Sequence, residues 1–152
     1  MSAGDLAETL ALARAGKRVA TTNGCFDLLH VGHLRYLQAA RAMGDLLIVA
    51  INSDASVRAL KGPSRPLVSQ DDRAELLAGL RCVDYVVIFD APTPLDVLTQ
   101  IRPDVHVKGG DYDADTLPEA AALRALGVEL AFVPLVSGKS TTALAKRLSA
   151  GV

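Results

Sequence analysis

T-N-G-C-F-D-L-L-H-V-G-H-L-R-Y-L, residues 22–37, is the stretch that decides the fold of this chain. Its pattern is that of a strand end, a turn that contains glycine and the start of a helix, with His30 and His33 on either side of Gly32. Gly32 lets an anion approach the backbone, and a helix start adds unpaired N–H groups and a positive dipole end. Because both histidines can face one anion, the stretch indicates a turn that binds a phosphate chain.

Charge stabilisation is the chemistry that this pair would supply. As hydrogen-bond donors, His30 and His33 can stabilise negative charge that develops on a pentacoordinate phosphorus. The alternative from the residues alone is two surface histidines near a helix cap. Zinc is the weaker alternative, because the only other histidine, His106, falls inside a predicted strand and no third ligand is evident.

Length, charge and cysteine content narrow the class of protein. The 152 residues fit one domain, which we expect over residues 1–152 with a leading helix within residues 1–16. The net charge of −1 and the pI of about 6.3 provide no basic field for nucleic acid or a membrane surface. The two cysteines, Cys25 and Cys82, form no disulfide framework. The N-terminus lacks the layout of a signal peptide, and no apolar run approaches the ~20 residues of a membrane helix, so we expect a cytoplasmic protein.

Strands and helices alternate along the chain. Apolar runs predict strands over residues 17–22, 45–51, 83–89, 104–108 and 128–134. Helical spacing and cap residues predict helices over residues 3–15, 31–43, 55–60 and 118–126, and others that open at residues 69–70, 93–96 and 140. This order predicts a single-domain α/β fold, a doubly wound, parallel, five-stranded sheet with right-handed crossovers.

Several residues within these helices carry specific expectations. Gly44 is expected as the glycine that ends the second helix, and Pro94 as the first residue of another helix. Leu76, Leu77 and Leu80 are expected to be buried, in the helix that Ser69 to Asp72 open with a capping box.

In such sheets ligands bind beyond the carboxyl ends of the strands, near the point where the strand order reverses. Two further loops there have phosphate-binding character. After the fourth strand, Gly109 and Gly110 permit close approach of a base or ribose, and Asp111 can accept a hydrogen bond or help to hold Mg²⁺; the alternative is an ordinary Gly-Gly turn. After the fifth strand, residues 138–141 resemble the end of a Walker A loop, but the first glycine of that motif is absent, and the alternative is a plain helix cap.

A nearly neutral protein that binds polyanions must cluster its cations locally. Lys61, Arg65, Arg73 and Lys108 all fall in or near the loops of the expected ligand edge. Each alone would more often be a solvated surface residue.

Residues 24–33, G-C-F-D-L-L-H-V-G-H, resemble the HxGH group, the cytidylyltransferase-like branch of the nucleotidyltransferase superfamily. The resemblance continues through residues 61–66, K-G-P-S-R-P, and residues 107–112, V-K-G-G-D-Y, and covers nearly the whole chain from about Leu10. Within the group, the chain is most similar to the adenylyltransferases of bacterial ADP-heptose synthesis. It looks like the nucleotidyl-transfer half of the bifunctional heptose enzyme, without the sugar-kinase half.

The resemblance implies that AMP passes from ATP to D-glycero-D-manno-heptose 1-phosphate, with release of pyrophosphate. It implies three catalytic residues: His30, His33 and Lys61. The nucleotide-binding residues that it implies are Asn23, Gly24, Cys25, Phe26, Gly32, His33, Lys108, Gly109, Gly110, Asp111, Ser140, Thr141 and Thr142. The substrate-binding residues are Asp27, Lys61, Arg65 and Arg73. Mg²⁺ is expected to be carried by the triphosphate, with Asp111 as the candidate contact and no directly ligating cage; a homodimer is left open.

One departure from the group bears on the nucleotide. Glycerol-phosphate cytidylyltransferases carry an Arg-Thr pair before the last Ser-Thr, whereas residues 135–139 here contain no arginine. This weakens a CTP-dependent interpretation and leaves Lys139 as a substitute cation.

Other functions remain as alternatives. The same chemistry could act on glycerol 3-phosphate with CTP, or on a flavin mononucleotide with ATP, as in FAD synthetases. A nucleotide-binding regulatory module without catalysis is a different class. A dinucleotide-dependent oxidoreductase is disfavoured, because G-x-G-x-x-G is absent after the first strand.

Overall fold

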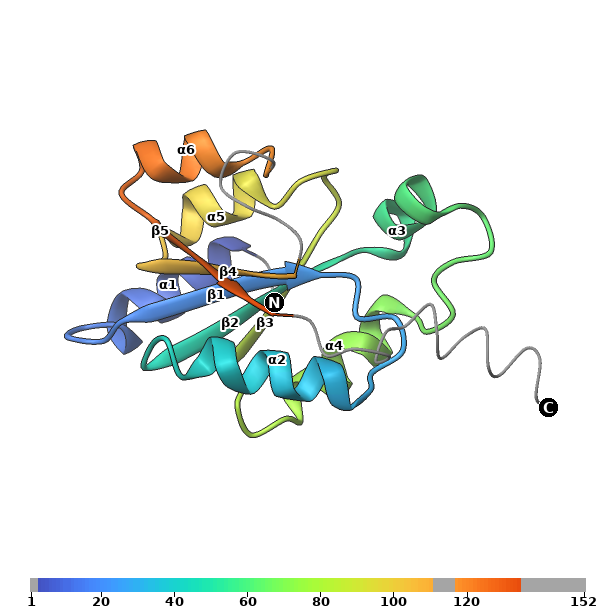
Figure 1. Ribbon diagram of the computed structural model, residues 1–152, viewed down its shortest axis with the longest axis horizontal. Coiled ribbons are helices and arrows are strands. Elements are labelled where there is room, and N and C mark those ends of the chain that lie inside the picture. Colours follow the sequence, from blue (N-terminus) through green and yellow to red (C-terminus); the bar gives the residue numbers. More distant parts are fainter. Residues whose placement is uncertain (1–2, 111–116, 135–152) are drawn as a thin grey trace.

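The computed structural model describes residues 3–110 and 117–134 (Figure 1). Its helices are α1 (Ala3–Ala13), α2 (Val31–Arg41), α3 (Asp54–Lys61), α4 (Gln70–Ala78), α5 (Leu95–Ile101) and α6 (Ala120–Ala125). Its strands are β1 (Val19–Gly24), β2 (Leu46–Asn52), β3 (Tyr85–Phe89), β4 (Val105–Gly109) and β5 (Glu129–Val133). The predicted helix at residue 140 lies outside the described residues.

The five strands form one parallel sheet in the order β3-β2-β1-β4-β5, which confirms the predicted fold class. The chain moves outward from β1 to β3, then crosses back to place β4 on the other side of β1. The strand order therefore reverses between β1 and β4. At such a point the flanking connections diverge to opposite faces of the sheet and leave room for a ligand.

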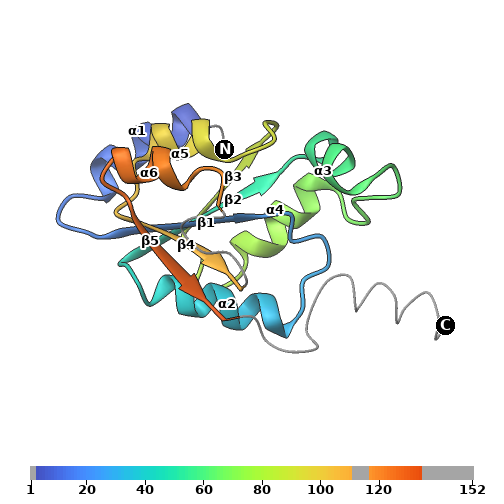
Figure 2. The same ribbon diagram turned by 45° about the horizontal axis from the view of Figure 1, so that its top comes forward.

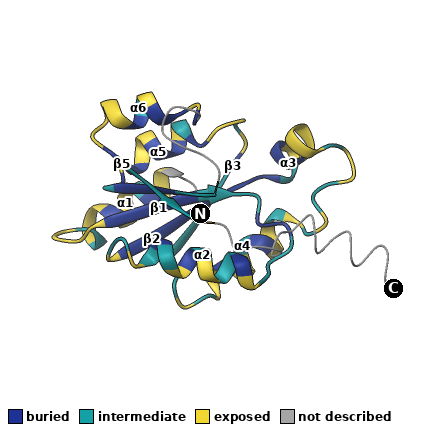
Figure 3. Ribbon diagram, in the orientation of Figure 1, coloured by how far each residue is buried: buried dark blue, intermediate teal, exposed yellow. Residues whose placement is uncertain are grey.

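Helices cover both faces of the sheet (Figures 1 and 2). One face packs under α1, α5 and α6, in a core that includes Leu6, Leu98 and Leu123. The other packs under α2 and α4, in a core that includes Leu37 and Leu77. Every residue of β2 is buried, as its unbroken apolar sequence predicts, and Figure 3 shows exposed residues mainly on the outer sides of the helices.

Helix α3 stands beyond the carboxyl edge of the sheet rather than over a face (Figures 1 and 2). Ser53 caps it by accepting a hydrogen bond from the Ser56 N–H at 3.2 Å. The chain then returns through residues 62–69 to α4, which Ser69 caps through the Asp72 N–H at 3.3 Å. The second crossover thus brings a loop and two helix starts to the edge where ligands are expected.

Four local predictions are wrong. Leu80 lies beyond the end of α4 at Ala78 and is half-buried rather than buried within that helix. Leu76 is 54% exposed, because its position on α4 points away from the sheet that buries Leu77. Pro94 precedes α5 as its N-cap residue instead of being its first residue. Helix α2 ends at Arg41 with Ala42 as C-cap, so Gly44 does not end it. A Cβ at Gly44 would lie 2.8 Å from the Arg18 carbonyl oxygen, so this glycine allows close approach to the start of β1.

Across the described ranges, none of the helices combines the length and the apolar character that crossing a bilayer requires.

A buried histidine lies on the β1–β4 pair, on the face that α1, α5 and α6 cover. His106 is fully buried, and its Nδ1 lies 2.8 Å from the Thr21 Oγ1. Its Nε2 has no hydrogen-bond partner among residues 3–110 and 117–134. Burial, aided by the nearby Lys108 charge, lowers the pKa of His106 from 6.5 to about 3. The folded protein therefore holds this ring neutral at pH values where the unfolded chain protonates it.

We predict that His106 makes folding acid-sensitive. The pKa of His106 is lower in the folded protein than in the unfolded chain. The free energy of unfolding is therefore unaffected by this ring above about pH 6.5 and decreases as the pH falls toward 3. In urea titrations, His106→Gln should flatten the decline of the free energy of unfolding between pH 6.5 and 4. Thr21→Val, which removes the hydroxyl but keeps the titrating ring, should retain the wild-type slope. Equal slopes in all three proteins would contradict the prediction.

Candidate functional site

The histidine turn lies at the amino end of α2, directly after β1. His30 is the N-cap of α2, with extended φ and ψ of −141° and 175°, and its Nδ1 accepts a hydrogen bond from the Gly32 N–H at 3.1 Å. This bond places the ring proton of a neutral His30 on Nε2. The rings of His30 and His33 stack with centroids 3.9 Å apart and 24° between their planes. The Phe26 ring lies 5.1 Å from the His33 ring and tilts against it.

The surroundings of His33 keep its ring neutral near pH 7. Burial is the largest cause that lowers its pKa, followed by the charges of His30 and Lys61, while a hydrogen bond with the Leu28 backbone opposes them; the pKa of His33 is about 4. Lys61 is therefore within electrostatic reach of the imidazole, although it belongs to α3. A bound polyphosphate would stabilise the positive charges of this group.

We predict that the coupling within this group is visible in the titration of His33. By NMR, the His33 ring should titrate with a pKa of about 4, and its pKa should rise in Lys61→Met and in His30→Gln, because each change removes a positive charge that opposes protonation. Arg35→Met, which removes an exposed cation from the same helix, should leave it unchanged. A wild-type pKa near 6.5 would contradict the prediction.

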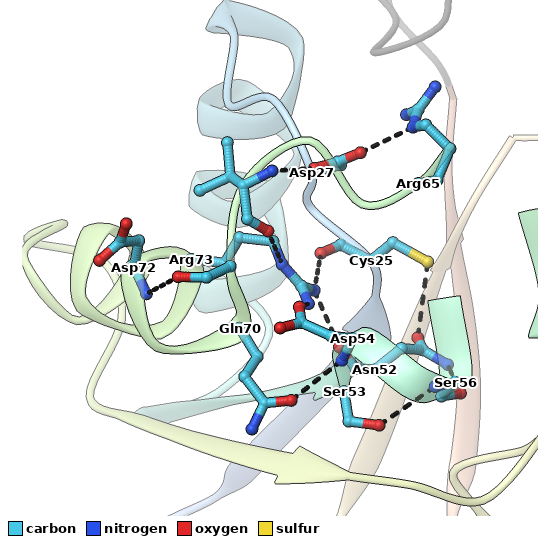
Figure 4. Close-up of polar contacts among 12 residues, drawn as sticks. Cys25, Asp27, Asn52, Ser53, Asp54, Ser56, Arg65, Gln70, Asp72 and Arg73 are labelled. Carbon is cyan, nitrogen blue, oxygen red and sulfur yellow. Dashed lines mark hydrogen bonds and ion pairs between the residues drawn. The ribbon is translucent and has the colours of Figure 1, made fainter. Parts of the chain in front are cut away.

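Asp27 anchors the loop between α3 and α4 to the histidine turn (Figure 4). Its Oδ1 accepts hydrogen bonds from the Leu67 and Val68 N–H groups at 2.8 and 2.9 Å. Its Oδ2 accepts from the Arg65 Nε at 2.7 Å and from Leu67 N–H at 3.0 Å. Burial raises the pKa of this carboxyl, but the hydrogen bonds from Leu67, Val68 and Arg65 outweigh burial and hold it below the ordinary value.

The same loop presents cations beside the turn. The Arg65 side chain is 17% exposed, its Nε is engaged by Asp27, and its Nη2 is buried without a hydrogen-bond partner in the part of the chain that the structure describes. Lys61 ends α3 and is exposed. Both therefore fit the roles expected for anion contacts.

Arg73 is fully buried and ties together the elements around the turn (Figure 4). Its Nε donates to the Val68 carbonyl at 2.9 Å, and its Nη1 donates to the Cys25 and Asn52 carbonyls at 2.7 and 2.8 Å. Its Nη2 pairs with the Asp54 carboxylate at 2.8 Å. One guanidinium thus joins the residue after β1, the last residue of β2, the first turn of α3 and the entry to α4.

These contacts change the roles expected for Arg73 and Asp27. Both were expected to bind substrate, but the Arg73 side chain and the Asp27 side chain are each fully buried and satisfied by protein groups. Direct contact with a sugar phosphate would require these hydrogen bonds to break. The structure gives both residues internal partners, which favours positioning over substrate contact.

We predict that Arg73 is required for stability. Arg73→Met should lower the free energy of unfolding by roughly 3 kcal/mol or more, because it leaves buried acceptors without a donor and removes the Asp54 partner. Urea denaturation measures the change. Arg81→Met, at an exposed arginine, should stay within about 0.5 kcal/mol of wild type. An equally small effect at Arg73 would refute its structural role.

On the other side of the strand-order reversal, Lys108 and Asn23 meet across β4 and β1. The Lys108 Nζ donates to the Asn23 Oδ1 at 3.1 Å. Burial lowers the pKa of Lys108, although Glu119 and Cys25 act against it. Gly110 follows with a positive φ of 68° and donates its N–H to the Val133 carbonyl at 2.7 Å.

The remaining residues of the turn after β1 pack closely. A Cβ at Gly24 would lie 2.9 Å from the Phe26 ring. The backbone of Phe26 has a positive φ of 48°. The Cys25 Sγ lies 3.8 Å from the Asn52 Oδ1. The expected nucleotide-binding residues Asp111, Ser140, Thr141 and Thr142 lie outside the described residues, as does Lys139.

The structure adds residues that the sequence did not single out. Asn52, the last residue of β2, and Asp54, the first residue of α3, accept hydrogen bonds from Arg73, and Glu119 is buried near Lys108. The Tyr36 hydroxyl donates to the Val107 carbonyl at 2.8 Å and lies 2.6 Å from the Thr22 Oγ1. Burial, with opposition from Thr22, raises the pKa of Tyr36 to about 12. In the sequence, the position of Tyr36 one helical turn after His33 could have indicated that it lies near the site.

Within the described ranges, no three or more His, Cys, Asp or Glu side chains converge in a way that could hold a metal ion. Near the histidines, the Asp27 carboxylate is saturated and that of Asp54 is paired. These described residues therefore fit Mg²⁺ only as an ion that arrives on phosphate oxygens, which is how nucleotide sites commonly hold it.

The described part of the chain is an α/β domain with a parallel sheet, and its stacked histidines lie at a helix start, beside the strand-order reversal and near local cations, an arrangement suited to binding a nucleotide. Comparison with known proteins agrees. The family described as cytidylyltransferase-like matches residues 21–148. The chain belongs to this family.

Known relatives and a solved structure extend the comparison. The bifunctional protein HldE of Syntrophotalea carbinolica is 54% identical over 135 residues, which cover 89% of this chain and 28% of that protein. HldE of Geobacter sulfurreducens is 51% identical over 144 residues, which cover 94% and 29%. The chain thus spans less than a third of these relatives. The crystal structure of a lipopolysaccharide core biosynthesis protein from Thermoplasma volcanium has a TM-score of 0.65 at 25% identity, covering 80% of this chain and 98% of that one.

Proposed function

We propose that this chain transfers AMP from ATP to a sugar 1-phosphate, D-glycero-D-manno-heptose 1-phosphate, giving ADP-heptose and pyrophosphate. The observation that carries the proposal is the stacked pair of His30 and His33 at the amino end of α2, 3.9 Å apart and within reach of the Lys61 charge. Identity of about half to HldE proteins and the structural neighbour's role in lipopolysaccharide core biosynthesis support a sugar acceptor.

The chemistry is one in-line displacement. A phosphate oxygen of the sugar 1-phosphate forms a bond to the α-phosphorus of ATP, and the bond from that phosphorus to the bridging oxygen breaks, so that pyrophosphate leaves with its electron pair. No covalent enzyme intermediate is needed. Positioning and fixed electrostatics provide the catalysis.

The residues divide this work by location. His30, through its Nε2–H, and the His33 ring stabilise charge on the transferring and leaving phosphates. Lys61 neutralises and positions both substrates, and Arg65 binds the acceptor phosphate. Asp111 is the candidate contact for Mg²⁺ carried by the triphosphate, and the ion would supply positive charge that offsets the charge of the phosphate oxygens.

The nucleoside is proposed to lie in the crevice at the reversal between β1 and β4. Asn23 and Gly24 end β1 and Gly32 lies in the first turn of α2, while Lys108 and Gly109 end β4 and Gly110 follows them. Asp111 and residues 140–142 remain expected contacts. Asparagine and backbone groups without bulky side chains suit a base or ribose that lies close to the chain.

The test is direct. Incubation with ATP, Mg²⁺ and heptose 1-phosphate should release pyrophosphate and form ADP-heptose, and His30→Ala/His33→Ala should lower kcat by at least about 100-fold, the order expected when fixed transition-state donors are lost. Lys61→Ala should lower kcat/KM for both substrates. Pyrophosphate release no higher than that of the double variant would overturn the proposal.

A panel of nucleotides and acceptors is the control. ATP with heptose 1-phosphate should give the highest kcat/KM, above CTP with glycerol 3-phosphate and ATP with flavin mononucleotide. Preference for either of the latter pairs would reassign the acceptor within the same chemistry. Tight ATP binding without turnover on any acceptor would instead identify a regulatory module.

A further inference from the structure

Asp27 and Arg73 hold the same short segment from opposite sides. Asp27 accepts hydrogen bonds from the Leu67 and Val68 N–H groups, and Arg73 donates to the Val68 carbonyl. The segment just before α4 is therefore bonded both to the turn that follows β1 and to α4 itself. Arg65, two residues before Leu67, is held by this arrangement.

Asp27 also fixes the orientation of the Arg65 guanidinium. The Nε–H of Arg65 donates to the Asp27 Oδ2 at 2.7 Å, and Figure 4 shows the terminal nitrogens of Arg65 directed away from that carboxylate. The Nη2 is buried and has no hydrogen-bond partner within residues 3–110 and 117–134. A planar fork held along its Nε edge offers its remaining donors in one direction, a geometry suited to bidentate binding of a phosphate.

We propose that Asp27 is a positioning residue for nucleotidyl transfer, which acts through Arg65 by holding the arginine's terminal nitrogens toward the phosphate of the acceptor. Asp27 itself contacts no substrate, because its oxygens are already filled by Arg65, Leu67 and Val68. The identity of the acceptor in this inference rests on the proposed function. The geometry of the Asp27–Arg65 pair is independent of that function.

The substitution Asp27→Asn separates orientation from loop anchoring. The remaining carbonyl oxygen of asparagine can still accept from the Leu67 and Val68 N–H groups. The new amide group faces the Arg65 Nε–H, so two donors oppose each other and the guanidinium loses its fixed direction. The loop thus keeps its backbone contacts while Arg65 loses its partner.

A double-mutant cycle with inorganic phosphate as the probe tests the inference without catalysis. By calorimetry, Asp27→Asn and Arg65→Ala should each weaken phosphate binding by about tenfold, and the double variant should bind no more weakly than Arg65→Ala alone, since Asp27 acts through Arg65. Multiplicative effects, or unchanged binding in Asp27→Asn, would overturn the inference. With heptose 1-phosphate and ATP, Asp27→Asn should raise the KM of the acceptor more than that of ATP, which a general loss of structure would not do.

Asp84→Asn is the matched control. The Asp84 Oδ2 also accepts from a backbone N–H, that of Leu47 at 2.8 Å, and also pairs with an arginine Nε, that of Arg41 at 3.2 Å. It lies at the amino end of the sheet, just before β3, so phosphate binding and both KM values should be unchanged. Equal effects at Asp84 and Asp27 would show that only stability is involved and would overturn the positioning role.

A measurement on the unmodified protein covers the case in which Asp27→Asn does not fold. In ¹⁵N NMR, added phosphate should shift the Nη resonances of Arg65 while the Nε–H stays bonded to Asp27. An Arg65 that does not respond to phosphate refutes the inference. If phosphate binds in this way but heptose 1-phosphate is not adenylylated, the proposed function fails and the positioning role stands.

Discussion

A buried guanidinium requires an acceptor for nearly every N–H, and Arg73 meets this requirement with groups from three separate segments of the chain. Cys25 directly follows β1 and Asn52 is the last residue of β2, so by binding both carbonyls the cation fixes the carboxyl ends of two neighbouring strands relative to each other. Asp54 and Val68 add α3 and the entry to α4. Because an unpaired buried charge costs several kcal/mol, these segments are held in one arrangement.

The net charge of −1 coexists with a local cluster of positive groups. Positive groups gather at one edge of the sheet, where Lys61 and Arg65 approach the histidine turn from the second crossover and Lys108 approaches from β4. Burial and neighbouring charge keep His33 neutral, so its ring is a fixed dipole at this edge of the sheet. Preorganised dipoles of this kind can stabilise developing charge without reorganising.

Much of the fold could be predicted from the sequence, because its signals are local. The unbroken apolar run of β2 showed a strand buried on both faces, and Ser53 and Ser69 showed helix starts. Leu76 and Gly44 were misassigned for a physical reason. Whether Leu76 is buried depends on how α4 packs against the sheet. Gly44 is required by its close approach to the Arg18 carbonyl, which is a contact between residues distant in sequence.

The sequence by itself determined the class of fold and the pairing of His30 with His33 around Gly32, since these follow from periodicity and from spacing within one turn. Only the tertiary structure decided which charged groups have internal partners. Asp27, Arg65 and Arg73 are indistinguishable in sequence as polar residues near the site, yet Asp27 and Arg73 are satisfied by internal hydrogen bonds, while the buried Nη2 of Arg65 has no hydrogen-bond partner among the described residues. The physical reason is that hydrogen-bond satisfaction depends on acceptors from distant strands and loops, and no local pattern encodes them.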